Sequence, residues 1–322
     1  MRDDLEPYVK LSERNYPTVY LDIPSFLGSK VAKDKKDMRD CEICFLGIPW
    51  EGANTWGSWS GCILTPMYVR KNSLRYYGGF IPELNVKVPS KFKICDCGDV
   101  VVDMQSRAVT FENIERKIGE ILDAKSVPII MGGDHSITVP IIKAMLEKGK
   151  NPLILHFDAH YDNAPSYLGD EYARACPIRR IVDDLGVPPQ NVIQLGIRGP
   201  RNSPAGKDYA DEMGIKVYDI WHLKREGFDE VIKEIRKRAE KTDGVYITIC
   251  MDVLDSSVAP AAAGDPLGLT SHELIDALMR IVSQTKLLGM DIVEIYPPLD
   301  IRDMTTHLAI WIILYTLAAM QK

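Results

Sequence analysis

Three ligand-type side chains stand at alternate positions in the segment Asp158-Ala159-His160-Tyr161-Asp162, directly after the apolar run 152–157. In an extended chain, residues i, i+2 and i+4 point to the same side. Two carboxylates and one imidazole can therefore converge where a strand ends, and such a ligand set suits Mn²⁺, Ni²⁺, Co²⁺ or Zn²⁺. The segment predicts half of a catalytic metal centre. The alternative is that these side chains only end a strand and cap the next helix.

Two further apolar runs end in the same way. Residues 129–131 lead into Gly132-Gly133-Asp134-His135-Ser136, and residues 246–249 lead into Cys250-Met251-Asp252. The carboxyl ends of parallel strands meet at one edge of an α/β sheet, which is where such folds place their sites. The three segments together therefore predict one shared metal site.

The chain resembles the ureohydrolase family, which includes the arginases and agmatinases, in three motifs that follow one another along the sequence: residues 132–136, residues 158–162 and Asp252-Val253-Leu254-Asp255. The resemblance extends from about Cys44 to the C-terminus. It implies a three-layer α/β/α fold around a mainly parallel sheet of roughly eight strands. It also implies two divalent metal ions, manganese or nickel, and hydrolysis of a guanidino or amidine C–N bond. The products would be urea, or a urea derivative, and an amine, and the substrate would be a small cationic guanidino compound.

The resemblance also implies which residues bind the metals. His135 would bind one ion and His160 the other, with Asp158 as a bridge between them. Asp162 would bind the first ion and contact the hydroxide that attacks the substrate, since two divalent ions lower the pKa of a shared water to near neutral. Asp252 would chelate the second ion.

Cys250 departs from the family pattern, which usually has a carboxylate at this position as a second bridge. As a thiolate, Cys250 would suit Ni²⁺ or Zn²⁺ better than Mn²⁺. A thiol cannot replace a bidentate carboxylate, so one metal site is expected to be weak or empty. The nearby Asp255 is expected to support its loop.

Three side chains are candidates for substrate contact. Glu294 matches the family glutamate that pairs with the substrate guanidinium, and with Asp162 it is a predicted catalytic residue. Arg174 stands where many relatives have a proton-shuttling histidine, a role that an arginine cannot fill at pH 7. It would either anchor an anionic group or fill the pocket and repel a guanidinium. Trp56, in a tryptophan-rich loop, would attract a cation with about 0.5–2 kcal/mol or pack against another subunit.

The elements that position these residues follow from the apolar runs, and short apolar strands alternating with helices predict a parallel sheet covered on both faces. Strands are expected at 44–48, 93–97, 128–131, 153–157, 192–195, 216–218, 245–249 and 288–295, and helices at 111–124, 228–241 and 271–283, the last with Ser271 as its N-cap. Residues 308–320 predict a buried C-terminal helix, too short to cross a membrane. We expect residues 1–40 to form a surface arm and residues 41–322 a single domain.

Composition and charge indicate which partners and which cellular compartment to expect. The net charge of −6, without a basic patch, argues against nucleic acid as a partner. The N-terminus lacks the apolar core of a signal peptide, and an odd number of cysteines, seven, favours a reducing cytoplasm. The spacings Cys41-x-x-Cys44 and Cys95-x-Cys97 are compatible with structural zinc, but the places of Cys44 and Cys95 in expected strands favour buried free thiols. His156, His222, His272 and His307 are interpreted as packing or surface residues.

Two hypotheses on function follow. In the first, the chain is a working metal-dependent amidine hydrolase with an altered metal bridge. In the second, it is a catalytically degenerate subunit that supports an active homologue, as in heteromeric ureohydrolases of the biguanide (metformin) hydrolase kind; Cys250 and Arg174 favour this hypothesis. A metal-binding regulatory protein is a third possibility. The family implies trimers or hexamers, of one chain or with a homologous catalytic subunit.

Overall fold

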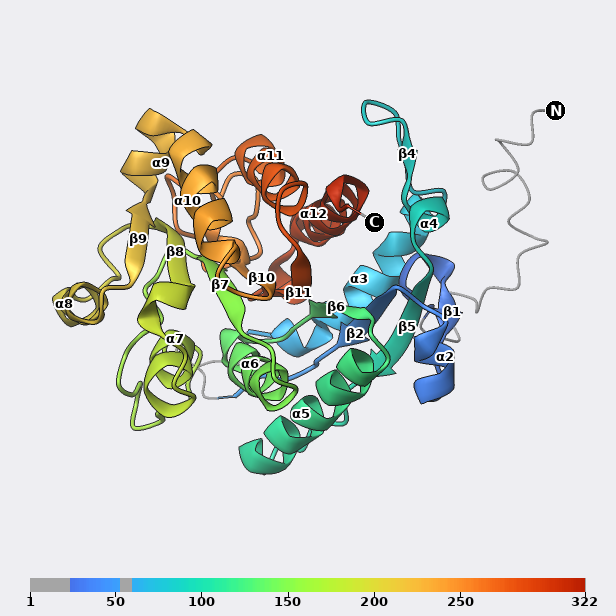
Figure 1. The fold of residues 1–322 in the computed structure, drawn as a ribbon, viewed down its shortest axis with the longest axis horizontal. Coiled ribbons are helices and arrows are strands. Elements are labelled where there is room, and N and C mark those ends of the chain that lie inside the picture. Colours follow the sequence, from blue (N-terminus) through green and yellow to red (C-terminus); the bar gives the residue numbers. More distant parts are fainter. Residues whose placement is uncertain (1–23, 53–59, 322) are drawn as a thin grey trace.

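The computed structural model describes residues 24–52 and 60–321. At its centre lies a nine-stranded sheet in the order β1-β5-β2-β6-β11-β10-β7-β8-β9, and every pair of neighbours in it is parallel (Figure 1). The strands are β1 (Lys30–Val31), β2 (Ile43–Gly47), β5 (Ile94–Asp99), β6 (Val127–Met131), β7 (Pro152–Phe157), β8 (Val192–Ile197), β9 (Lys216–Asp219), β10 (Gly244–Cys250) and β11 (Leu287–Val293). A separate hairpin pairs β3 (Phe80–Ile81) with β4 (Val86–Lys87).

Helices cover both faces of the sheet, as Figure 1 shows. Each face has its own apolar core, and the central strands β7, β10 and β11 are buried along their whole length. Burial on both faces explains why these strands are continuously apolar rather than alternating. One layer contains α2 (Lys35–Arg39), α5 (Arg107–Asp123) and α6 (Thr138–Glu147); the other contains α3 (Thr65–Ser73), α10 (Asp229–Ala239), α11 (Ser271–Val282) and α12 (Met304–Ala319).

Four further α-helices belong to the described part of the chain. They are α4 (Val88–Lys91), α7 (Pro177–Arg179), α8 (Pro204–Met213) and α9 (Ile220–Glu226). Among the described residues, no helix has the length and apolar character that crossing a membrane requires.

The predicted three-layer α/β/α fold is confirmed, and all eight expected strands are present. The ninth, β1, pairs with β5 at the edge of the sheet. Residues 24–40 of the expected arm thus contribute a strand and α2 to the fold, and Phe26 stacks on Phe45 with ring centroids 4.2 Å apart. Residues 1–23 lie outside the described part of the chain, and the domain bounds stay a prediction.

The N-cap of α11 differs from the expectation. Thr270, not Ser271, caps the helix, because its side chain accepts a hydrogen bond from the Glu273 N–H while the Glu273 carboxylate accepts one from the Thr270 N–H. This reciprocal capping box satisfies two backbone donors that a helix start leaves free. Ser271 is the first residue inside the helix.

Candidate metal centre and substrate pocket

Four neighbouring strands at the centre of the sheet, β6, β11, β10 and β7, deliver the predicted site residues at their carboxyl ends. His135 follows β6, Glu294 follows β11, and Asp252 follows β10. The segment from Asp158 to Asp162 follows β7. The sheet order therefore brings together residues that are up to 159 positions apart in the chain.

The first group of ligand atoms surrounds His135. Its Nδ1 lies 3.0 Å from Asp158 Oδ2 and 3.0 Å from Asp162 Oδ2. The imidazole and the Asp158 carboxylate are almost fully buried, while the Asp162 side chain is 10% exposed. Asp162 is thus the member of the group that reaches the solvent-accessible pocket.

The second group surrounds His160. Its Nδ1 lies 3.3 Å from Asp158 Oδ1 and 3.2 Å from Asp252 Oδ2. The thiol of Cys250 joins Asp158 and Asp252 in a set whose ligand atoms are all within 4.8 Å of one another. Asp158 belongs to both groups, with Oδ2 towards His135 and Oδ1 towards His160.

The ligand atoms are placed to bind metal ions and do not satisfy one another by hydrogen bonds. His135 Nδ1 and Asp158 Oδ2 are both buried, yet neither has a hydrogen-bond partner among the described residues. Buried polar atoms without partners are costly and rare in folded proteins. Nitrogen and carboxylate oxygen donors of this kind are ligands for Mn²⁺, Ni²⁺ or Zn²⁺. The residues present therefore fit two divalent ions, one in each group.

A hydrogen bond behind His135 holds its Nδ1 towards the carboxylates, and an acidic side chain lies behind His160. Thr248 donates to Asp291 Oδ1 at 2.7 Å, so its hydroxyl oxygen accepts from His135 Nε2 at 2.9 Å. The proton of His135 is thereby held on Nε2, and Nδ1 keeps its lone pair for a metal. On the other side, His160 Nε2 lies 3.4 Å from Asp265 Oδ2. Partners of this kind orient metal-binding histidines and raise metal affinity.

His156 belongs to the site, in contrast to the interpretation as a packing or surface histidine. The ring is fully buried, and its Nε2 lies 3.2 Å from Asp158 Oδ2. The amide nitrogen of Gln194 donates to the Tyr161 carbonyl at 2.8 Å and approaches His156 Nδ1 at 3.0 Å. An amide nitrogen only donates, so His156 carries its proton on Nε2, facing Asp158. In this tautomer His156 is not itself a metal ligand, and its Nε2 lies beside the bridging carboxylate without a hydrogen bond among the described residues.

Cys250 is 2% exposed and lies in the second group. Burial, together with the charges of Asp158 and Asp252, raises the pKa of the thiol well above its ordinary value. In the absence of a cation the group is therefore neutral. Only a bound ion would favour the thiolate that could serve as a ligand.

The backbone at the two predicted catalytic residues is unusual. Asp162 has φ 46° and Glu294 has φ 62°, in the left-handed region that side chains other than glycine rarely adopt. Each such residue costs on the order of 1–3 kcal/mol, and they cluster at functional sites. Close packing adds a second constraint, since a Cβ on Gly133 would lie 1.7 Å from the Trp50 carbonyl oxygen. The loop that carries His135 therefore needs glycine at this position.

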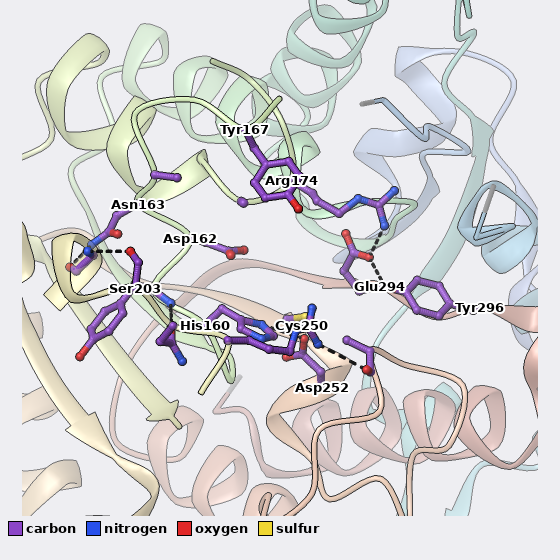
Figure 2. A pocket seen from close by; sticks show the side chains of 17 residues that line it. His160, Asp162, Asn163, Tyr167, Arg174, Ser203, Cys250, Asp252, Glu294 and Tyr296 are labelled. Carbon is purple, nitrogen blue, oxygen red and sulfur yellow. Dashed lines mark hydrogen bonds and ion pairs between the residues drawn. The ribbon is translucent and has the colours of Figure 1, made fainter. Parts of the chain in front are cut away.

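Glu294 is paired with the chain's own Arg174 (Figure 2). Its Oε2 accepts from Arg174 Nη1 at 2.8 Å and from the Tyr296 hydroxyl at 2.8 Å, and its Oε1 accepts from the His135 N–H at 2.9 Å. Burial raises the pKa of Glu294 to about 7, although Arg174 opposes the shift. The guanidinium of Arg174 thus occupies the carboxylate that was expected to receive a substrate guanidinium.

Arg174 lies in an acidic environment. It is 6% exposed, and its Nη2 lies 3.4 Å from Glu51 Oε1 and 3.9 Å from Asp134 Oδ2. Burial alone would lower the pKa of the guanidinium, but Glu294 and Asp134 raise it above its ordinary value. Of the two expectations for Arg174, filling the pocket describes this arrangement.

The pocket above the metal groups has a volume of about 400 Å³. Figure 2 shows Asp162, His160 and Cys250 on one side of it, with Arg174 turned towards Glu294 on the other. Its rim is polar and includes Asn163, Tyr167, Arg201, Asn202 and Ser203. Trp56, the third predicted substrate contact, lies outside the described residues.

Arg198, which follows β8, organises the loop after the metal ligand Asp252. Its guanidinium donates to the carbonyl oxygens of Asp252 at 2.7 Å, Leu254 at 3.1 Å and Asp265 at 2.9 Å. Asp255 accepts hydrogen bonds within the same loop, from Ser257 and Gly268, as expected of a loop support. His222, His272 and His307 are absent from the potential metal-binding groups of the described residues.

Comparisons with known proteins identify the chains that this one resembles. Residues 41–319 match the model of the Arginase family. Formimidoylglutamase from Bacillus subtilis is 32% identical over 280 residues, covering 86% of each chain, and its crystal structure has a TM-score of 0.83, covering 98% of this chain and 97% of that one. Agmatinase from Bacillus anthracis is 30% identical, covering 87% of this chain and 92% of its own. A structure of Trypanosoma cruzi formiminoglutamase, solved with Mn²⁺, has a TM-score of 0.79 at 20% identity, covering 92% and 98%.

Proposed function

The chain belongs to the arginase family, and from that premise we propose that it hydrolyses the C–N bond of a guanidino or amidine compound with two divalent metal ions, Mn²⁺ or Ni²⁺. The position of the Asp158 carboxylate carries the proposal, because one oxygen faces His135 and the other faces His160. A carboxylate in this position would be shared by two ions, of which each histidine would hold one.

The ligand sets follow from the two groups. His135, Asp158 and Asp162 would hold the first ion, and His160, Asp158 and Asp252 the second, with Cys250 as a further ligand of the second group. Ions bound there supply a hydroxide at neutral pH by lowering the pKa of a shared water.

Asp162 is the proposed proton acceptor. Its carboxylate lies at the pocket surface beside His135, within the group that faces the substrate. We assign it the proton of the attacking hydroxide as the C–N bond breaks, and the transfer of that proton to the departing amine. General acid–base transfer of this kind contributes roughly 10²–10⁴-fold to a rate.

Arg174 decides which substrates reach Glu294. A substrate guanidinium can pair with Glu294 only if the Arg174 guanidinium, 2.8 Å away, turns aside. We propose that the substrate carries an anionic group, which draws Arg174 away from Glu294, so the preferred class is guanidino or amidino acids. The name of the Bacillus subtilis relative, formimidoylglutamase, designates a substrate of this acidic kind.

The test compares substrates with and without a carboxylate. The Mn²⁺- or Ni²⁺-loaded chain is incubated with 3-guanidinopropionate, formimidoylglutamate or agmatine, and urea, formamide and amine are measured. Turnover of an acid in preference to agmatine supports the proposal. His135→Ala is the inactive control. A chain that binds two ions yet hydrolyses none of the three contradicts it.

The same contact between Arg174 and Glu294 supports a second candidate function, that of a catalytically inactive partner subunit. A self-filled guanidinium site together with a thiol in place of a bridging carboxylate would leave a folded chain without turnover. Co-purification with a homologous ureohydrolase, whose activity rises several-fold when this chain is added, would favour it over the first proposal.

We further propose an oligomeric assembly, a trimer or hexamer of this chain or with a homologous subunit. The seven cysteines are all free thiols, which suits a reducing cytoplasm as the setting.

A further inference from the structure

Three cysteines cluster on the neighbouring strands β2 and β5, and a fourth precedes β2. These strands are not among the four that carry the metal centre described above. β2 and β5 are neighbours, and Cys44 stands directly opposite Cys95 in their register. Cys97 follows Cys95 by two residues and so lies on the same face of β5. Cys41, just before β2, belongs to the same core, and its thiol donates to the Asp37 carbonyl oxygen at 3.4 Å.

The sulfur atoms are close enough to share one ion. Cys44 Sγ and Cys95 Sγ lie 3.4 Å apart, and the thiols of Cys44, Cys95 and Cys97 are all within 4.8 Å of one another. A tetrahedral zinc ion with Zn–S bonds of about 2.3 Å holds its sulfur ligands roughly 3.8 Å apart. The Cys44–Cys95 separation of 3.4 Å is close to that value, so an ion requires only small movements of the three inner side chains. Cys41 would turn from the Asp37 carbonyl to complete the set.

We propose that Cys41, Cys44, Cys95 and Cys97 form a thiolate site for a soft d¹⁰ cation, Zn²⁺ in the first place. A set of sulfur ligands alone selects such an ion over the harder cations that suit a carboxylate-rich centre. The site shares no residue with the catalytic groups. The ion would fasten the start of β2 to β5.

The surroundings suit a structural ion. Cys44 and Cys95 are fully buried, and apolar residues of α5, among them Ile114 and Ile118, belong to the same core.

An entry path leads to the cluster. Cys41 is 8% exposed and lines a cavity of about 620 Å³. Lys30, Lys87 and Lys93 line the same cavity. Cys41 is therefore the cysteine of the proposed site that a metal ion can reach from this cavity.

Zinc-edge X-ray absorption on the Mn²⁺-loaded, full-length protein tests the proposal without a mutation. One zinc per chain with only sulfur neighbours, at about 2.3 Å, is the expected result. Zinc with nitrogen or oxygen neighbours, no retained zinc, or a Cys44–Cys95 disulfide found by mass spectrometry would overturn it.

Variants locate the ion. Cys95→Ser should lose the zinc and, with it, the rise in thermal unfolding midpoint that added zinc gives the wild type. Cys41→Ser, at the margin of the cluster, provides the same test if Cys95→Ser does not fold. Cys176→Ser, another buried thiol, should keep the zinc, as should Cys250→Ser. Loss of zinc only in Cys250→Ser would place the ion in the catalytic centre and refute the proposal.

Discussion

Replacing Arg174 with alanine removes the guanidinium that fills the acidic side of the pocket. Breaking a buried ion pair by removing one partner costs about 3–5 kcal/mol. Glu294 loses a contact of 2.8 Å, but it keeps the Tyr296 hydroxyl and the His135 N–H as donors. Glu51 lies at 3.4 Å from the guanidinium and keeps two backbone donors. We therefore expect a loss near the lower limit, about 3 kcal/mol in the free energy of unfolding.

Free guanidinium should restore part of this loss, because Arg174→Ala leaves a cavity of its size beside Glu294. The assay is urea denaturation with millimolar guanidinium chloride, compared with equal sodium chloride. A ligand at 100 times its Kd stabilises the folded state by about 2.7 kcal/mol. The variant should also lose the preference for guanidino acids over agmatine.

Arg70→Ala is the matched control. Arg70 is also buried and ion-paired, to Asp96 at 2.8 Å, but it lies outside the pocket. It should lose stability without any change in substrate preference. If Arg174→Ala costs less than about 1 kcal/mol, and guanidinium stabilises it no more than it stabilises the wild type, Arg174 does not occupy a guanidinium site.

Three further predictions concern the metal centre. Cys250→Asp should tighten the second ion by at least roughly tenfold, about 1.4 kcal/mol, in metal titrations of chelator-stripped protein; unchanged affinity would show that the thiol is not the limiting defect. Thr248→Val removes the hydroxyl that accepts from His135 Nε2 and should lower the affinity for the first ion by about 10–100-fold. Thr316→Val, a buried threonine of α12 whose hydroxyl has no partner among the described residues, should leave metal affinity unchanged. Gly133→Ala forces a Cβ to 1.7 Å from a backbone oxygen and should abolish binding of the first ion, whereas Gly119→Ala within α5 should be neutral or stabilising by up to about 1 kcal/mol; equal metal binding by both glycine variants would contradict the packing argument.

Much of the fold could be predicted because the sheet interior imposes a simple pattern. Strands buried on both faces are short apolar runs, and all eight of those runs form strands. β1 was missed because a strand of two residues, Lys30 and Val31, has no periodicity. Its pairing depends on the neighbouring edge of β5, which sequence does not reveal.

The ligand residues were predictable because they follow apolar runs at fixed spacing, but the groups behind them were not. Asp291 and His156 are buried within strands, and a charged or polar residue inside such a run was an available signal. Arg198 gave no signal, since its carbonyl partners come from a loop at least 54 residues away. The cysteine spacings were a signal, but only the register of β2 against β5 shows that Cys44 lies beside Cys95.

The most direct test of the two-metal centre is anomalous diffraction from crystals of the full chain grown with Mn²⁺. We predict two peaks within a few ångströms of each other, one between His135 and Asp162 and the other between His160 and Asp252, with Asp158 in contact with both. A single peak at saturating Mn²⁺, or peaks that do not share Asp158, would contradict the account.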